Sequence, residues 1–169
     1  MNIIELLLKE LNEETAITRK MLERVPNEQY NWQPHVKSMT VRGLATHIAD
    51  LPNWIAMMLT TAELDFANNT WKEEVINNTE ELLACFDKSV LNGKAHLEKA
   101  TEEQLQEQWI LRSGDHIILQ STKYEFIRIT FGQMIHHRAQ MGVFLRLLNI
   151  PIPGSYGPSA DEMEFANVA

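Results

Sequence analysis

Three of the six histidines occupy positions where a metal site could form. His47 and the adjacent pair His136 and His137 lie among apolar residues at helical spacing. An unpaired imidazole is costly to bury, so these side chains need partners. Imidazoles from two facing helices can build a metal site inside a helical bundle, because the helices fix their directions and the core excludes water. Neutral imidazole is a good ligand for zinc, nickel, iron and copper.

The spacing of these residues limits how they act together. Neighbouring residues on a helix point about 100° apart, so His136 and His137 do not readily serve one metal. Gln133 lies one turn before His137 on the same face, and its amide oxygen is a weaker donor than imidazole. We predict a metal site of His47, Gln133 and His137, with His136 as the alternative ligand if the helix is rotated. In a second interpretation, His47 and His137 are core histidines that form hydrogen bonds with each other or with nearby carbonyls.

Four long segments with apolar residues every three or four positions must carry these side chains. They cover residues 4–25, 40–58, 79–97 and 122–150. Thr40 is the expected N-cap of the second helix, and Thr122 with Glu125 matches a capping box at the start of the fourth. Pro52 falls inside the second helix and is expected to kink it.

These segments predict an all-α fold, an antiparallel four-helix bundle with long connections. Residues 109–119 resemble a small hairpin with its turn at 113–115, just before the last long helix. Residues 65–79 are expected to form a connection, and Thr101 to begin a short helix. A capping box at 159–162 indicates a brief terminal helix. The whole chain, 1–169, is predicted to be a single domain.

The charge balance narrows the classes of partner. The chain has 15 Lys and Arg against 23 Asp and Glu, a net charge of −8 with histidine neutral. Such a field repels nucleic acid and anionic lipid, so we expect no binding to nucleic acid and no association with membranes. The first residues lack a basic leader and an apolar core of signal-peptide length, and no apolar run approaches spanning length. We therefore expect a cytoplasmic location.

Two stretches of sequence carry a family resemblance. They cover residues 31–48 and 136–162. The second is the more distinctive, with His-His-Arg-Ala-Gln at 136–140 and Tyr-Gly-Pro-Ser-Ala-Asp-Glu at 156–162. The chain resembles the DinB/YfiT-like family of helical bundles over nearly its whole length.

The resemblance implies a four-helix bundle, often dimeric, with a divalent metal bound by one histidine of the second helix and two of the fourth in a His-x-x-x-His pattern. His47 matches the first ligand position and His137 the last, while Gln133 occupies the middle position. The metal would be zinc, nickel, iron or manganese. Family members include thiol-dependent transferases and hydrolase-like proteins, so a small molecule or thiol is the implied substrate.

Two functional hypotheses follow. The first is a hydrolase or thiol transferase that depends on a divalent metal held between the second and fourth helices. The alternative is a metal-free bundle that binds a small ligand or pairs with itself, having lost the third ligand at Gln133. No residue in the sequence identifies the catalytic groups or the substrate.

The remaining expectations concern two polar residues of the fourth helix, the C-terminal tail and the oligomeric state. Arg138 is expected to pair with an acid such as Asp50, and Gln140 to cap a carbonyl. The tail 156–162 either covers an open end of the bundle as a lid or ties the chain down. A homodimer is expected, because three apolar residues lie outside the main stripes of their helices. These residues are Leu7, Ile135 and Val143.

Overall fold

The computed structural model describes residues 2–68 and 75–163 of the chain. Its long helices are α1 (Ile3–Leu22), α2 (Val41–Thr60), α3 (Thr79–Leu97) and α5 (Lys123–Leu147). The short elements are a 3-10 helix (Asn27–Gln29), α4 (Glu102–Leu105), β1 (Glu63–Asp65), β2 (Gln108–Ser113) and β3 (His116–Thr122).

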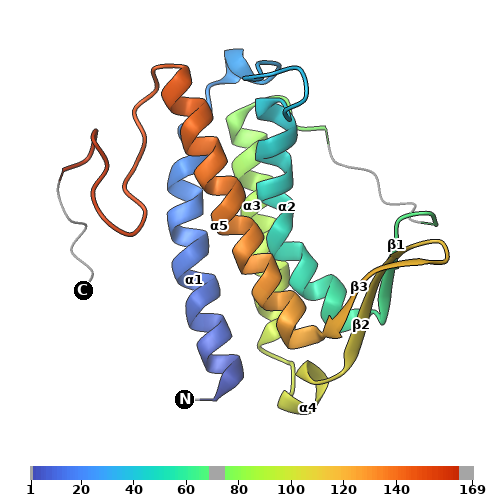
Figure 1. Cartoon of the computed structure of the whole chain (residues 1–169). Helices are drawn as coiled ribbons and strands as arrows, with labels where there is room; N and C mark the ends of the chain where they lie inside the picture. The colour runs from blue at the N-terminus through green and yellow to red at the C-terminus, as the bar shows by residue number, and fades with distance from the viewer. Residues whose placement is uncertain (1, 69–74, 164–169) are drawn as a thin grey trace.

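The four long helices pack side by side, and the strands extend away from one end of them (Figure 1). Helices α1 and α5 run in one direction, and α2 and α3 run in the opposite direction (Figure 1). Helix α2 has its most extensive contacts with α3 and α5. Residues of α2 can therefore meet side chains from both neighbours.

The prediction of an all-α fold is wrong, because the described residues also form a three-stranded sheet in the order β1-β2-β3. Strands β2 and β3 are the antiparallel hairpin expected from the sequence, and Gly114 has the positive φ of 58° that its turn requires. Strand β1 pairs in parallel with β2. It was missed because three residues carry little periodicity and their partner strand lies far along the chain.

Side-chain contacts explain why β1 joins the hairpin. Arg112 of β2 donates from Nη2 to the Glu63 carboxylate at 2.6 Å. Asp65 accepts a hydrogen bond of 2.9 Å from the Gly114 backbone amide at the turn. These bonds attach a segment expected to be a plain connection, and they set one wall of the site described below. The centre of that predicted connection, residues 69–74, lies outside the described residues.

Local capping sets the helix starts where the sequence predicted them. The Thr40 hydroxyl accepts from the Gly43 amide at 3.1 Å. The capping box of Thr122 and Glu125 is present, and hydrogen bonds from Ser121 and Thr122 lower the pKa of Glu125 to about 2. Thr101 caps the short helix α4. At the other end of the chain, the Ser159 hydroxyl accepts from the Asp161 amide as in a cap.

That last cap does not lead into a helix within the part of the chain that the structure describes. Residues 159–163 are irregular, and the rest of the predicted terminal helix lies outside the described residues. No helix among the described residues has the length and apolar character needed to cross a membrane.

Two clusters of buried side chains form the core between the long helices. One includes Leu22, Ile48 and Phe86, with Trp32 packed edge-on against Phe144 at a ring-centroid distance of 5.6 Å. The other cluster lies nearer the sheet and includes Leu11, Ile55, Trp109 and Phe131. Together they hold α2 and α5 face to face.

Candidate functional site

The imidazoles of His47 and His137 meet across the contact between α2 and α5. Their ring centroids are 4.6 Å apart and the ring planes are nearly perpendicular, at 86°. Both side chains are half-buried. His47 lies near the start of α2 and His137 beyond the middle of α5. They come to the same level because the two helices run in opposite directions (Figure 1).

Gln140 fixes the orientation of His137. The two side chains are one turn apart on α5, and His137 Nδ1 lies 2.9 Å from Gln140 Oε1. A carbonyl oxygen can only accept, so Nδ1 carries the proton and donates it. The lone pair of neutral His137 is then on Nε2. Gln140 therefore acts on an imidazole instead of capping a carbonyl as expected.

Burial and His137 keep His47 uncharged. Desolvation lowers the pKa of His47 below its ordinary value, and the neighbouring His137 lowers it further. The carboxylate of Asp50 opposes both effects and raises the pKa of His47. Because the ordinary value is about 6.5, His47 is neutral at pH 7. A neutral imidazole can accept a proton or a metal ion.

Asp50 lies one turn after His47 and belongs to a chain of hydrogen bonds along α2. Its carboxylate accepts from Trp54 Nε1 and from Asn53 Nδ2, each at 3.1 Å. Asn53 Oδ1 in turn accepts from Asn92 Nδ2 of α3 at 2.9 Å. This set of hydrogen-bonded residues was not predicted from the sequence. The available signal was spacing, since residues at three and four positions share a helix face.

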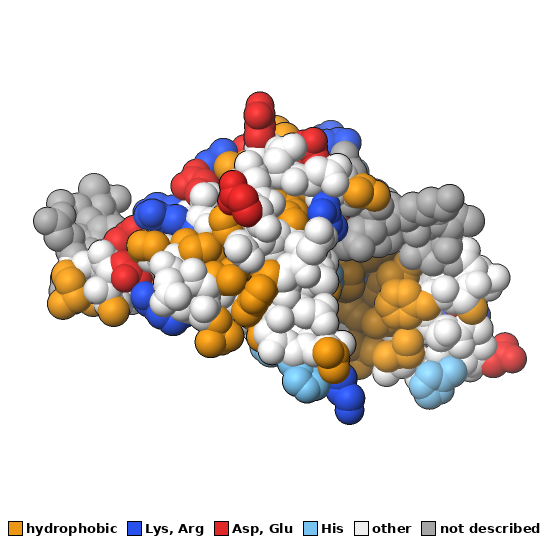
Figure 2. Space-filling view, turned by 90° about the horizontal axis from the view of Figure 1, so that it is seen from above, with side chains coloured by type: hydrophobic (Ala, Val, Ile, Leu, Met, Phe, Trp, Pro, Cys, Tyr) orange, Lys and Arg blue, Asp and Glu red, His pale blue; other side chains and the backbone are white. Residues whose placement is uncertain are grey.

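A groove of about 850 Å³ opens beside His47, between α2, α3 and the segment around β1. We call it the groove. Its volume is within the range of small-molecule sites. The hollow lined with hydrophobic side chains in Figure 2 lies between the helices and the strands. The groove is lined by His47, Asp50, Asn53, Trp54, Ala56, Met57, Thr60, Thr61, Leu64, Phe66, Lys88, Asn92 and His96.

The other predicted ligands are less closely associated with His47. His136 is exposed, and its ring centroid is 4.9 Å from that of His137. No ring contact joins His136 to His47 among the described residues. Gln133 is half-buried on α5, one turn before His137, and its side chain makes no hydrogen bond to a described residue. The structure thus brings together two of the three predicted ligands as an imidazole pair.

This donor set does not fit a metal site with three strong protein ligands. The described residues contain no group of three or more His, Cys, Asp or Glu side chains that could hold a metal ion. An amide oxygen from Gln133 would be the third donor, and amide oxygen suits zinc, nickel and iron less well than imidazole. The geometry brings together two imidazoles, one of which lines the groove.

Arg138, next in sequence to His137, points away from the groove. It pairs with an acid as expected, but the acid is Glu14 of α1 and not Asp50, because its guanidinium is buried against α1 and donates to Glu14 Oε2 at 2.7 Å. It also donates to Thr18 Oγ1 at 3.0 Å and to the Tyr156 hydroxyl at 2.7 Å. Adjacent helix positions face about 100° apart, so His137 meets α2 while Arg138 meets α1.

The tail ties the end of the chain to α1 and α5. The Tyr156 hydroxyl also donates to Glu14, at 2.7 Å from Oε1. Asp161 pairs with Arg146 at 2.5 Å and Glu162 with Arg24 at 2.8 Å. These contacts favour the interpretation of the tail as a tie-down over that of a lid.

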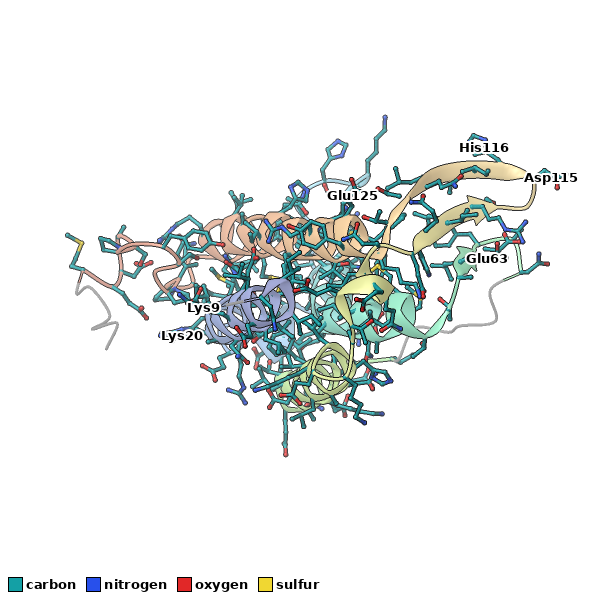
Figure 3. The ribbon with its side chains drawn as sticks, turned by 90° about the horizontal axis from the view of Figure 1, so that it is seen from below. Lys9, Lys20, Glu63, Asp115, His116 and Glu125 are labelled. Atoms are coloured by element: carbon teal, nitrogen blue, oxygen red, sulfur yellow. The ribbon has the colours of Figure 1, made fainter. Side chains whose placement is uncertain are left out.

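The remaining histidines lie in different surroundings. His116 stands at the far tip of the β2 and β3 hairpin, beside Asp115 (Figure 3). His35 is exposed in the loop before α2. His96 is half-buried and lines the groove. Its Nδ1 donates to the Asn92 carbonyl at 2.9 Å, because that carbonyl can only accept.

Comparison with known proteins identifies a family and a shared fold. The model of the DinB family matches residues 1–167. A DinB-like protein from Bacillus cereus has 22% sequence identity and a TM-score of 0.72, over 90% of this chain and 97% of that one. A DinB-like protein from Bacillus subtilis has 18% identity and a TM-score of 0.68, over 89% and 96% of the two chains.

A conserved protein from Enterococcus faecalis is also similar in fold, with 18% identity and a TM-score of 0.63 over 88% of this chain and 98% of that one. At these identities the likeness concerns the fold alone. No curated protein matches the chain.

Proposed function

Because the chain belongs to the DinB family, we propose that it binds and acts on a small molecule held in the groove, with His47 and His137 as the reactive pair. The observation that carries this proposal is the position of His47, which lines the groove and contacts the His137 ring at 4.6 Å between centroids. Sites of this kind combine a concave, largely apolar lining with a few polar groups whose pKa values are shifted.

The pair is suited to accept a proton from a bound molecule. His47 is neutral at pH 7 for the reasons given above, and the lone pair of His137 is on Nε2 because Gln140 accepts the Nδ1 proton. Two imidazoles this close disfavour a second positive charge, so the pair takes up one proton before two. The carboxylate of Asp50 opposes the two effects that lower the pKa of His47.

Binding is tested with a neutral fluorescent probe, N-phenyl-naphthylamine, whose emission rises in apolar sites. We expect saturable binding to the wild-type protein. Met57→Trp fills the groove and should abolish binding, whereas Ala139→Trp, which introduces the same side chain at an exposed position on α5, should not. Binding should also shift the His47 ring resonances in NMR spectra and leave those of His116 unchanged. Equal binding by the two Trp variants would contradict the proposal.

One observation favours a second candidate, the metal-dependent hydrolase or thiol transferase. Two neutral imidazoles in contact are strong donors to zinc, nickel, iron and copper. The candidates are separated by elemental analysis of protein purified without a histidine tag, followed by calorimetric titration with zinc, nickel and manganese. Stoichiometric metal would support the metal-dependent enzyme. No metal and no heat of binding would support the metal-free small-molecule site.

A further inference from the structure

The lining of the groove carries two charges of opposite sign. Lys88 of α3 is exposed and Asp50 of α2 is half-buried, and both line the groove. The Asp50 carboxylate accepts its hydrogen bonds from the neutral groups of Trp54 and Asn53, which do not remove its negative charge. Within the part of the chain that the structure describes, neither Asp50 nor Lys88 forms an ion pair. Both charges are therefore available to a ligand.

A hydrogen bond between the two helices fixes the level of these charges. Asn92 of α3 donates to Asn53 of α2 at 2.9 Å, and the two helices run in the same direction (Figure 1). Lys88 is one turn before Asn92. Asp50 is about one turn before Asn53, so the two charges lie at the same level of the groove. Axes of packed helices are about 8–10 Å apart, so a small head group that carries both charges can contact Asp50 and Lys88 together.

The apolar part of the groove begins one turn farther along α2. Trp54 and Met57 follow Asp50 toward the strands, and Leu64 and Phe66 continue the lining in the β1 segment. The Phe66 side chain is 50% exposed, so it offers apolar surface that a ligand can cover. From Asp50 to Met57 the helix rises about 10 Å, at 1.5 Å per residue. That length accommodates the side chain of an apolar amino acid.

We propose that the groove selects α-amino acids with an apolar side chain, bound as zwitterions. The ammonium group contacts Asp50, the carboxylate contacts Lys88, and the side chain lies along Trp54 and Met57. This inference rests on the proposed function, because it assigns a ligand class to the same groove. His47 is one turn before Asp50, so the imidazole pair is next to the polar end of the ligand. A ligand with only one of the two charges leaves the other protein charge without a partner and binds more weakly.

Displacement of the bound neutral probe measures this preference. Four compounds share a phenyl ring and differ in charge. L-phenylalanine carries both charges, phenethylamine lacks the carboxylate, 3-phenylpropionate lacks the ammonium group, and 2-phenylethanol lacks both. L-phenylalanine should displace the probe at the lowest concentration, by about fivefold relative to either singly charged compound, as expected for partly exposed charge pairs.

Two substitutions test which protein charge contacts which group of the ligand. Lys88→Ala should weaken L-phenylalanine and 3-phenylpropionate by about fivefold and should not weaken phenethylamine. Asp50→Asn should weaken L-phenylalanine and phenethylamine and should not weaken 3-phenylpropionate. The matched controls are Lys94→Ala, on α3 outside the groove, and Asp115→Asn, at the tip of the hairpin (Figure 3).

The outcomes separate this inference from the proposed function. Equal displacement by the four compounds, or strongest displacement by a compound other than L-phenylalanine, would overturn the amino-acid preference and leave the small-molecule site standing. Equal effects of the two groove variants and their controls would also overturn it. If neither the probe nor any of the four compounds binds, the latter measured by calorimetry, both the inference and the proposed function fail.

Discussion

At the scale of single residues, the protonation of His47 follows from what surrounds it. Its pKa is lowered first by burial and then by His137, and Asp50 works in the opposite direction. In the unfolded chain, the pKa of the same imidazole is the ordinary value of about 6.5. His47 therefore links the stability of the protein to pH.

We expect NMR titration to give a pKa for His47 below the ordinary value of about 6.5 for histidine. His137→Asn should raise the pKa of His47 and Asp50→Asn should lower it. Because the unfolded state binds more protons, the free energy of unfolding should fall as the pH drops from 7 through about 6.5 and toward the folded pKa. His47→Gln should reduce that slope. An unchanged slope, or a His47 pKa at or above the ordinary value of about 6.5, would contradict this account.

Gln133 is the position where the chain departs from the His-x-x-x-His pattern of the resemblance. If α5 keeps the family register, Gln133→His should add a third imidazole to His47 and His137. Zinc or nickel affinity should then rise by about tenfold or more, since imidazole is the stronger donor. Competition against a chelator of known strength measures the change.

His136→Ala is the matched variant and should alter that affinity little, because His136 is exposed and does not contact the His47 ring. A loss of binding in His136→Ala, with no gain in Gln133→His, would show that His136 is the ligand and that the assumed register is wrong. The metal site of His47, Gln133 and His137 stays a prediction until this is measured.

At the scale of elements, the groove depends on how closely α2 and α3 approach. Gly93 of α3 faces the backbone of Pro52, and a Cβ added at Gly93 would lie 2.3 Å from the Pro52 carbonyl oxygen. Backbone atoms cannot move aside as a flexible side chain can. Only glycine permits this approach, which also allows the Asn53 and Asn92 side chains to bond.

Gly93→Ala should therefore lower the free energy of unfolding by about 1–3 kcal/mol, as overpacking of a close contact does. Gly132→Ala is the control, since an added Cβ there meets nothing within 4 Å and the residue lies inside α5. Removing this second glycine should stabilise the helix by about 0.5–1 kcal/mol. Urea unfolding of both variants checks the opposite signs. Equal effects of the two substitutions on the free energy of unfolding would mean that α2 and α3 approach each other less closely at Gly93 than described.

At the scale of the whole molecule, the tail is joined to the core through one buried cluster of charges. Arg138 and Glu14 form a buried ion pair, and the Tyr156 hydroxyl bonds to both. Removing that hydroxyl leaves the buried Glu14 with fewer donors. Tyr156→Phe should cost about 1–2 kcal/mol of unfolding free energy, whereas Tyr124→Phe, whose hydroxyl bonds to no described residue, should cost little. Similar losses in the two variants would argue against the tie-down.

The predicted homodimer also belongs to this scale, and the structure changes which residues could form it. Leu7 is only 2% exposed, so it is part of the core and not of a surface. Val143 and Leu147 on α5 are 58% and 57% exposed. We expect sedimentation equilibrium at micromolar concentration to show a dimer, and Val143→Glu to convert it to a monomer. Val36→Glu, at an exposed loop position, is the control, and a monomeric wild-type protein would remove the prediction.

The sequence by itself determined the features that depend on neighbouring residues. Thr40 and Thr122 mark helix starts because a hydroxyl caps amides only two or three positions ahead. The apolar spacing predicted the long helices, and it predicted that His47 and His137 face inward. The turn residues around Gly114 indicated the hairpin. Each of these signals acts within a few residues, so it can be recognised without the fold.

Only the tertiary structure decided the features that join distant segments. The pairing of β1 with β2, the burial of Arg138 against Glu14 and the groove between α2, α3 and β1 all depend on which surfaces the helices present to one another. A strand as short as Glu63–Asp65 has too few residues to show an alternation of polar and apolar side chains, so its partner strand cannot be predicted from the sequence. Arg138 could have paired with an acid on either neighbouring helix. It pairs with Glu14 because the position of Arg138 on α5 faces α1.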